Sequence, residues 1–309
     1  MDKMKLSIII LSWNTGELLK QCLESVISGL FIKELTDYKC RVEIIVVDNA
    51  SEDGSCEMVK KEFPEVRLIQ NKENLGFAKG NNVGLKEAKG EFVMLLNSDT
   101  IVKSGAIEGL LSFLQKNLET VVSPVLELPD GQLQIDYYMR FPNLWQIFLY
   151  HHHPIFRPIA MKIPFLRKLL VSEPRNVPFE VDQLPAAALV APKTVWDKIG
   201  YFDPDYHFFF EDVDWSWRAE KLGIKRWVLP EAKIIHIGGG SWKKKLNNNS
   251  FGFYYQFFSS MLLFVRKNYG IFSQKIFKWS IIFNFLITFK HSLAWRFYKN
   301  DGKQAEFLE

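Results

Sequence analysis

The sequence has 309 residues, which is enough for one large domain or about two smaller ones. Apolar residues make up 48% of it and charged residues 24%, so the chain can bury a sizeable core and has an ordinary surface. The formal net charge of +4 is too small to indicate a nucleic-acid partner. The three cysteines lack metal-ligand spacing, which argues against a disulfide framework and favours a reducing compartment.

Strands and helices are predicted to alternate over the first third of the chain. Continuous apolar runs predict four strands, at residues 6–11, 42–47, 66–69 and 92–96. Apolar residues at helical spacing predict helices at 18–27 and after Ser104. This order predicts an α/β fold with a mostly parallel, Rossmann-like sheet and right-handed crossovers.

Polar residues follow each predicted strand at the point where the strand ends. They are Ser12, Trp13 and Asn14, then Asp48 and Asn49, then Asn71 and Asn74, and finally Asn97, Ser98 and Asp99. Because parallel sheets bind ligands at the carboxyl ends of their strands, these residues predict a ligand cleft. No G-x-G-x-x-G sequence and no Walker loop is present, which argues against a dinucleotide-dependent dehydrogenase and a P-loop kinase.

Carboxylates stand in two places that suit catalysis. Asp99 follows a buried strand and suits a hard divalent cation that bridges to a diphosphate, although an acid in a turn would look the same. Glu211, Asp212 and Asp214 lie within four residues after a run of three phenylalanines. Apolar surroundings and neighbouring like charges raise carboxyl pKa values, as is typical of functional sites. The bland alternative is that these acids complement the dipole of a following helix.

His236 precedes three glycines, at 238–240. A glycine run allows backbone N–H groups to approach phosphate oxygens, and a neutral histidine beside it could complete a metal shell. A lone histidine is more often a packed structural residue. The run His151–His153 is a second, weaker candidate for a metal site.

Together these segments resemble the inverting glycosyltransferases of the GT-A fold, family 2 type, and in particular their rhamnosyltransferase-like branch. The matching text is SIIILSWN (7–14), VVDNASEDGS (46–55), NLGFAKGNN (74–82), LLNSDT (95–100), GYFD (200–203), FEDVD (210–214) and HIGGGS (236–241). The resemblance covers about residues 6–125 and 180–242, in the order of the family, and it implies helices on both faces of the sheet.

The resemblance implies a role for each matching residue. Asp212 becomes the catalytic base, and Asp99 and His236 become ligands of a divalent metal, Mg²⁺ or Mn²⁺. The nucleotide-sugar donor is assigned to Ser12, Trp13, Asn14, Asp48, Asn74, Asn81, Asn97 and Ser98, with Asp48 reading the base. The acceptor side is assigned to Glu211, Asp214 and Trp242. One base and in-line attack imply inversion at the anomeric carbon.

The sequence departs from the family pattern at two points. Asn97 stands where the first acid of a D-x-D element is expected, which leaves one carboxylate for the metal. The stretch 184–189 lacks an expected Gly-Ala pair. Two alternatives stay open: a lapsed subunit that only binds a nucleotide sugar, and a nucleotidyltransferase. The second would need a basic, glycine-rich loop after the first strand, where residues 12–15 do not supply one.

The chain divides into four expected parts. Residues 1–125 form the nucleotide-sugar half, 126–179 a basic, aromatic insertion, 180–245 the acceptor and catalytic half, and 246–309 C-terminal amphipathic helices. The stretches 137–172 and 261–300 contain no acid among many aromatic and basic residues. They predict a peripheral enzyme at the cytoplasmic face of a membrane, with a lipid-linked glycan acceptor. The competing interpretation is a C-terminal helix packed on the catalytic domain or on another subunit. No apolar run is long enough to require a spanning helix, and the N-terminus lacks the features of a signal peptide.

Overall fold

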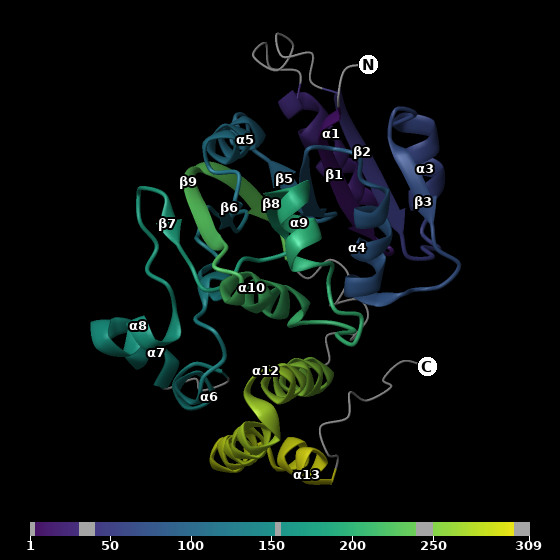
Figure 1. Cartoon of the computed structure of the whole chain (residues 1–309). Helices are drawn as coiled ribbons and strands as arrows, with labels where there is room; N and C mark the ends of the chain where they lie inside the picture. The colour runs from purple at the N-terminus through teal and green to yellow at the C-terminus, as the bar shows by residue number, and fades with distance from the viewer. Residues whose placement is uncertain (1–3, 31–40, 152–155, 239–249, 300–309) are drawn as a thin grey trace.

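The computed structural model describes residues 4–30, 41–151, 156–238 and 250–299. Within these residues one sheet of nine strands carries helices on both faces, and a separate group of C-terminal helices packs beneath it (Figure 1). The strand order is β3-β2-β1-β4-β8-β6-β9-β5, with β7 paired to β9. Strands from both predicted halves of the chain therefore belong to the same sheet.

The first part of the sheet is parallel, as the sequence predicts. It consists of β1 (Met4–Ser12), β2 (Arg41–Asp48), β3 (Arg67–Gln70) and β4 (Phe92–Asn97). The side chains of Ile8, Ile9 and Ile10 are all buried, because helices cover both faces of β1. The carboxyl ends of these strands meet at one edge of the sheet, which is the edge that carries the polar residues.

The second part of the sheet is mixed. It consists of β5 (Thr100–Val102), β6 (Thr120–Glu127), β7 (Phe179–Glu180), β8 (Ala188–Pro192) and β9 (Lys225–His236). β6 and β9 are parallel to each other, whereas β8 runs antiparallel to β4 and β6, and β5 and β7 run antiparallel to β9. β9 therefore ends beside the start of β5, so the two ends meet at the same place.

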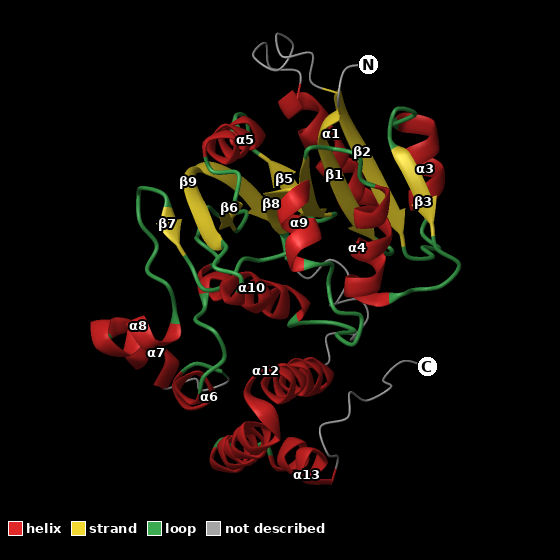
Figure 2. Ribbon diagram, in the orientation of Figure 1, coloured by secondary structure: helices red, strands yellow, loops and turns green. Residues whose placement is uncertain are grey.

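Helices cover both faces of the sheet, as expected for this fold class (Figure 2). One apolar core contains side chains of α1 (Gly16–Leu30), α3 (Ser55–Glu62) and α5 (Ala106–Lys116). The other contains side chains of α4 (Gly76–Glu87), α9 (Lys193–Ile199) and α10 (Glu211–Lys221). A Cβ atom at Gly84 would lie 2.4 Å from Cγ2 of Ile9, so α4 can approach β1 this closely only with glycine there.

The remaining helices belong to the insertion and to the C-terminal part. The insertion carries η1 (Ile135–Tyr138), α6 (Leu144–Leu149), α7 (Phe156–Lys162) and α8 (Pro164–Leu170). The C-terminal part is α12 (Ser250–Ile287), broken at Gly270 where φ is 87°, and α13 (His291–Lys299). Among the residues that the structure describes, no helix is both long and apolar enough to cross a membrane.

The first half of α12 packs on the loop that leads into α10. Tyr206 and Phe210 share an apolar core with Phe258 and Phe264 of α12. The Ser260 hydroxyl donates to the Phe208 carbonyl at 2.8 Å. The competing interpretation of the C-terminal segment therefore describes this half of the helix correctly, because its apolar side chains are covered by the catalytic part.

Candidate active site

A cleft of about 800 Å³ opens at the polar edge of the sheet. Its lining includes eight of the predicted site residues: Trp13, Asn74, Asn97, Ser98, Asp99, Glu211, Asp212 and His236. Five others lie outside this lining: Ser12, Asn14, Asp48, Asn81 and Asp214. Trp242 falls outside the residues that the structure describes.

The loops after β1, β2 and β4 are joined by short polar contacts. The Thr15 hydroxyl lies 3.0 Å from that of Ser12 and 2.9 Å from that of Ser98. Asn14 adopts a left-handed backbone, with φ at 53°, and its Oδ1 accepts from the Glu52 N–H at 2.8 Å. Asparagine tolerates this conformation better than most residues. Ser12 and Asn14 thus shape the loops beside the cleft.

Asp48 ends β2 as a buried carboxylate. Its Oδ2 accepts from the Ser51 N–H at 2.9 Å, whereas its buried Oδ1 has no hydrogen-bond partner among the described residues that meets normal geometry. The neighbouring Cys56 thiol is a weak donor, and burial, followed by the charge of Asp48, raises its pKa to about 11. The Oδ1 atom of Asp48 can therefore accept a hydrogen bond from a stronger donor than this thiol.

Asn49, which the sequence did not single out as a donor-binding residue, organises the next part of the cleft. Its Nδ2 donates to Asn74 Oδ1 at 3.3 Å and to the Gly76 carbonyl at 3.1 Å, and its Oδ1 accepts from Asn71 at 2.8 Å. Asn81 instead donates to the Phe77 carbonyl at 3.0 Å within α4, beneath the cleft. An asparagine network therefore fixes the loop after β3.

Asp99 and His236 meet because β5 and β9 pair at their ends. Thr100 lies opposite His236 in the ladder, and the Ile237 N–H donates to the Asp99 carbonyl at 2.9 Å. Asp99 Oδ1 lies 3.2 Å from His236 Nε2, and Asn97 Nδ2 lies 3.4 Å from the same nitrogen. Both Asp99 and His236 are buried. A carboxylate and an imidazole at this separation are suitable ligands for one divalent cation.

The protein offers few ligands at this place. Within the described residues, no three His, Cys, Asp or Glu side chains gather closely enough to hold a metal ion. A cation between Asp99 and His236 would thus take its other ligands from water or from a bound diphosphate, as Mg²⁺ sites commonly do.

Glu211 and Asp212 begin α10 at the cleft. Asp212 is half-buried, and its two oxygens accept from the N–H groups of Ala186 at 3.2 Å and Val213 at 2.8 Å. Burial raises its pKa above the ordinary value, although these hydrogen bonds oppose the shift. Burial, with the nearby charge of Asp212, raises the pKa of Glu211 further, and Glu211 Oε2 has no partner among the described residues. Burial therefore favours the protonated form of both carboxyls, and more strongly that of Glu211.

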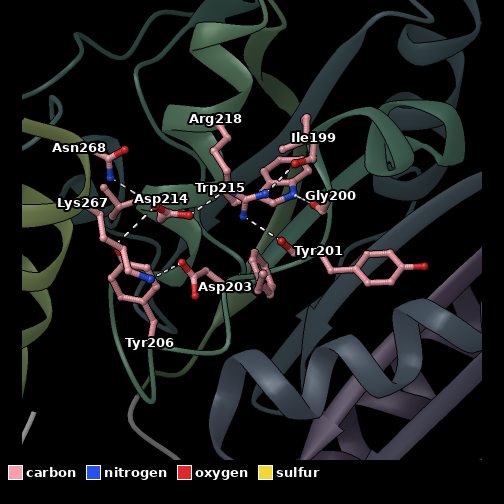
Figure 3. Close-up of polar contacts among 12 residues, drawn as sticks. Ile199, Gly200, Tyr201, Asp203, Tyr206, Asp214, Trp215, Arg218, Lys267 and Asn268 are labelled. Atoms are coloured by element: carbon pink, nitrogen blue, oxygen red, sulfur yellow. Dashed lines mark hydrogen bonds and ion pairs between the residues drawn. The ribbon is translucent and has the colours of Figure 1, made fainter.

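Asp214 points away from the cleft into a network that holds α10 in place (Figure 3). It accepts from Arg218 Nε at 2.9 Å and from Asn268 Nδ2 at 3.3 Å. Arg218 also donates to the carbonyls of Ile199 at 2.6 Å and Tyr201 at 2.8 Å. Asp214 therefore links α10 to the preceding loop and to α12, and its geometry is that of a structural residue.

The far end of the cleft is aromatic and carries two arginines. Phe208, Phe209, Phe253 and Phe257 line it together with Arg140 and Arg157. Each arginine is paired, Arg140 with Asp182 at 2.7 Å and Arg157 with Asp136 at 2.8 Å. This end could hold a ligand that has both apolar and anionic parts.

His151, the first residue of the histidine run, is buried near this end. Its ring lies 4.9 Å from that of Phe257 and 5.9 Å from that of Phe258. Burial lowers its pKa to about 4, so the ring is neutral at pH 7. His152 and His153 lie outside the described residues.

Gln134 and Tyr137 complete the surroundings of His236, and sequence reasoning missed both. Gln134 contacts the His236 ring and its carbonyl, and the ring centroids of Tyr137 and His236 are 5.5 Å apart. Both residues belong to the segment that the sequence assigns to an insertion. No local motif marked them, because their partner stands about a hundred residues further along the chain.

Comparison with known protein families agrees with the α/β fold and with the cleft at the carboxyl edge of the sheet. Residues 7–168 match glycosyl transferase family 2, so the chain belongs to that family. The GT-A fold, expected from the sequence, is also that of the similar solved structures. The mannosyltransferase PcManGT from Pyrobaculum calidifontis, in complex with GDP-Man and Mn²⁺, has a TM-score of 0.57 at 12% identity, covering 100% of this chain and 77% of that one.

Among curated proteins, the chain is similar to glycosyltransferase GlyG of Streptococcus pneumoniae, with 31% identity over 38% of this chain and 37% of GlyG. It is also similar to the N-acetylglucosaminyl-diphospho-decaprenol L-rhamnosyltransferase of Mycobacterium tuberculosis, with 25% identity over 63% of this chain and 66% of that protein. The chain thus spans less than two thirds of the length of these relatives. A second solved structure, S. aureus TarS 1–349 in complex with UDP, has a TM-score of 0.54 at 17% identity, covering 90% and 70% of the two chains.

Proposed function

We propose that this chain is an inverting glycosyltransferase that moves a sugar from a nucleoside-diphosphate sugar to a glycan acceptor in cell-surface polysaccharide synthesis. The observation that carries the proposal is that Asp99, His236 and Asp212 line one cleft at the carboxyl edge of the sheet. A metal-ligand pair and a raised-pKa carboxylate are the two groups that transfer from a diphosphate donor needs.

The donor would lie across the ends of β1, β2 and β4. The buried Oδ1 of Asp48 supports recognition of a base that presents an N–H donor, such as the imide of uracil or thymine. The names of two relatives, the rhamnosyltransferase above and the dTDP-rhamnosyl transferase RfbF of Shigella flexneri at 23% identity, favour dTDP-rhamnose. Trp13, Asn74 and Ser98, which line the cleft, would contact the rest of the donor.

Asp99 and His236 would hold the cation, Mg²⁺ or Mn²⁺, with Asn97 beside them. When bound, such an ion stabilises the negative charge that develops on the leaving nucleoside diphosphate. The pair fits this role because both side chains are buried while their facing atoms line the cleft. Asn97 stands where the first acid of the D-x-D element is expected. More of the coordination sites of the cation would therefore be filled by the diphosphate.

Asp212 would take the proton of the attacking hydroxyl. A sugar hydroxyl has a pKa far above 7, so attack needs a carboxylate within reach. The raised pKa of Asp212 makes it a stronger base than an exposed aspartate. Burial, followed by the charge of Asp212, raises the pKa of Glu211, which favours the protonated form that could donate to an acceptor oxygen. One base and direct displacement give inversion, without a covalent glycosyl-enzyme.

The acceptor would be lipid-linked and met at the cytoplasmic face of a membrane. Large apolar side chains are exposed on the insertion at Phe156, Ile159 and Phe165, and on the C-terminal helices at Phe272, Trp279, Phe289 and Trp295. The stretches 137–172 and 261–300, which carry these side chains, are acid-free and basic, which favours contact with anionic lipid headgroups. The aromatic end of the cleft lies between the insertion and α12, so an apolar tail could leave in that direction.

The test is a donor screen with the full chain. UDP-, dTDP- and GDP-sugars are incubated with polyprenyl-diphosphate-linked acceptors, with Mn²⁺ or with EDTA, and the nucleotide and glycan are followed by mass spectrometry. We expect transfer from one donor, dependent on the ion, with inverted anomeric configuration. Tight donor binding without turnover on any acceptor would instead indicate a subunit that only binds nucleotide sugars. A parallel reaction supplies a nucleoside triphosphate and a sugar 1-phosphate, and release of pyrophosphate there would indicate a nucleotidyltransferase.

A further inference from the structure

The Gln134 amide makes two hydrogen bonds to His236, and together they fix its orientation. Nε2 of Gln134 donates to the His236 backbone carbonyl at 2.6 Å, and Oε1 lies 3.0 Å from Nδ1 of the same residue's ring. A carbonyl oxygen can only accept, so the NH₂ end of the amide must face it. The amide oxygen therefore faces Nδ1 of the imidazole.

This orientation selects one tautomer of the neutral ring. An amide oxygen also can only accept, so Nδ1 must carry the proton that it receives. Nε2 of His236 is then unprotonated, and its lone pair faces Asp99 Oδ1 at 3.2 Å and Asn97 Nδ2 at 3.4 Å. The ring is buried and packs against Tyr137, which leaves it little freedom to turn. Two groups that can donate an electron pair, Asp99 and His236, thus point at one place.

We propose that Gln134 is a positioning residue that holds His236 in the Nδ1–H tautomer and so presents Nε2, together with Asp99, to a divalent cation. The proposal rests on the metal role given above to His236 and deepens it. Hydrogen bonds of this kind, from the far nitrogen of a metal-binding histidine, orient the ring and raise its affinity for the metal. Gln134 thereby ties the insertion to the catalytic edge of the sheet.

The tautomer is measured first, without metal or donor. The full chain is labelled with ¹⁵N-histidine, and long-range ¹H–¹⁵N spectra are recorded near pH 8. Of the six histidines, His236 is identified by the signal that His236→Gln removes. We expect the Nδ1–H pattern in the native chain and a shift toward Nε2–H in Gln134→Met. An Nε2–H or doubly protonated ring in the native chain, or no change in Gln134→Met, overturns the proposal.

Mn²⁺ affinity is measured next, by the loss of the free-ion signal in electron paramagnetic resonance, with UDP present. Gln134→Met should weaken binding by about 10- to 100-fold, the usual cost of losing such a partner. Gln134→Glu keeps an acceptor for Nδ1–H. Its affinity for Mn²⁺ should therefore be at least about one third of the native affinity. Gln115→Met removes an exposed glutamine of α5 that lies outside the cleft lining, and it should change neither readout. Equal losses in the Met and Glu variants would indicate a merely structural role and overturn the proposal.

The metal role of Asp99 and His236 and the positioning role of Gln134 can be refuted separately. Full transfer activity in excess EDTA would remove the metal role of the proposed function while the tautomer result could still stand. A native ring in the Nε2–H form would remove the role of Gln134 while sugar transfer remained possible by the groups already described.

Discussion

Asp99 and His236 come together through backbone pairing rather than through a local motif. β5 and β9 are antiparallel, and the last residue of β9 lies opposite the first residue of β5. Asp99 lies in the two-residue turn between β4 and β5, and the hydrogen bond from the Ile237 N–H to its carbonyl holds this turn against the end of β9. This rigidity suits a site where two protein ligands and a bound diphosphate must share one ion.

Removing Asp99 should therefore weaken the binding of a diphosphate in the presence of metal. Asp99→Ala is expected to lower the affinity for UDP or dTDP with Mn²⁺ on the order of tenfold or more, measured by calorimetry. The control is Asp130→Ala, which changes an exposed aspartate in a loop. Unchanged affinity in Asp99→Ala, or an affinity that is the same in EDTA, would show that this carboxylate does not bind a metal ion.

The sequence marked the residues whose neighbours lie close along the chain. Trp13, Asn74 and Asp99 each lie in the loop that follows a parallel strand, so the strand-end rule was enough to bring them to the cleft edge. Gln134 was missed because its hydrogen-bond partner is distant in sequence and no spacing rule connects them. The roles of Trp13, Asn74 and Asp99 in binding and catalysis stay predictions.

The start of α10 is the strained element of the site. Phe209 and Phe210 both have a left-handed backbone, with φ at 66° and 69°, which costs bulky residues about 1–3 kcal/mol each. Their rings pack against Phe257 of α12 at 5.7 Å and 5.2 Å, and such aromatic contacts offset part of this cost. The strained turn aims Glu211 and Asp212 into the cleft, and α12 keeps it in place.

Glu211 should make stability fall as pH rises. Its pKa in the folded chain lies well above the usual 4.5, so the folded state holds a proton that the unfolded state has lost. The unfolding free energy must therefore decrease from about pH 4.5 upward until the pH passes the folded pKa. Glu211→Gln carries no titrating proton there and should lose this part of the slope. Chemical denaturation across pH 5 to about 8 tests this.

An exposed glutamate provides the comparison. Glu231→Gln should leave the pH dependence of the unfolding free energy as it is in the native chain, because that side chain is exposed. If Glu211→Gln and Glu231→Gln behave alike, then Glu211 is ionised in the folded protein and cannot serve as a proton donor to an acceptor.

The element boundaries of the parallel half followed from hydrophobic patterning. All four expected strands are present, because a strand buried on both faces is a continuous apolar run. The strands β5, β6, β7 and β8 were not predicted. β5, β7 and β8 contain two to five residues each, which is too short for periodicity to be distinguished from a loop, whereas the eight residues of β6 were overlooked.

At the scale of the whole molecule, the insertion and the C-terminal helices form one group beneath the sheet. α6 contacts α12, and the Asn284 amide donates to the Ile147 carbonyl. The acid-free composition predicted either internal packing or a membrane surface. Residues of α12 before Gly270 are mainly buried, whereas Phe272, Trp279 and Phe289 are 75%, 57% and 84% exposed. After Gly270, Phe277, Ile281 and Phe285 are buried as well, so internal packing covers one face of this part. A membrane surface for the exposed face stays a prediction.

The exposed part should bind anionic vesicles. We expect the full chain to co-sediment with them at low salt and less at high salt, since each basic residue near the surface contributes about 1 kcal/mol. Replacing Phe272, Trp279 and Phe289 by serine should release it, because burial of these side chains in the interface is lost. The matched control replaces Leu118, Val177 and Leu222, which are also exposed but lie outside the acid-free stretches 137–172 and 261–300.

The control variant should sediment like the native chain. A native chain that stays in the supernatant at low salt would contradict the membrane assignment. So would equal binding by the two triple variants, since the aromatic residues of α12 and the following turn would then contribute nothing specific.

Asp212 is proposed as the base of the sugar transfer, and the turnover of Asp212→Asn tests this role. Asparagine keeps the size of the side chain but cannot take a proton, so turnover should fall by a factor on the order of 10² to 10⁴. Donor affinity, measured by calorimetry on the same sample, should stay within about threefold of the native value, because Asp212 acts on the acceptor. Near-normal turnover in Asp212→Asn would contradict the account and assign the proton transfer to another group.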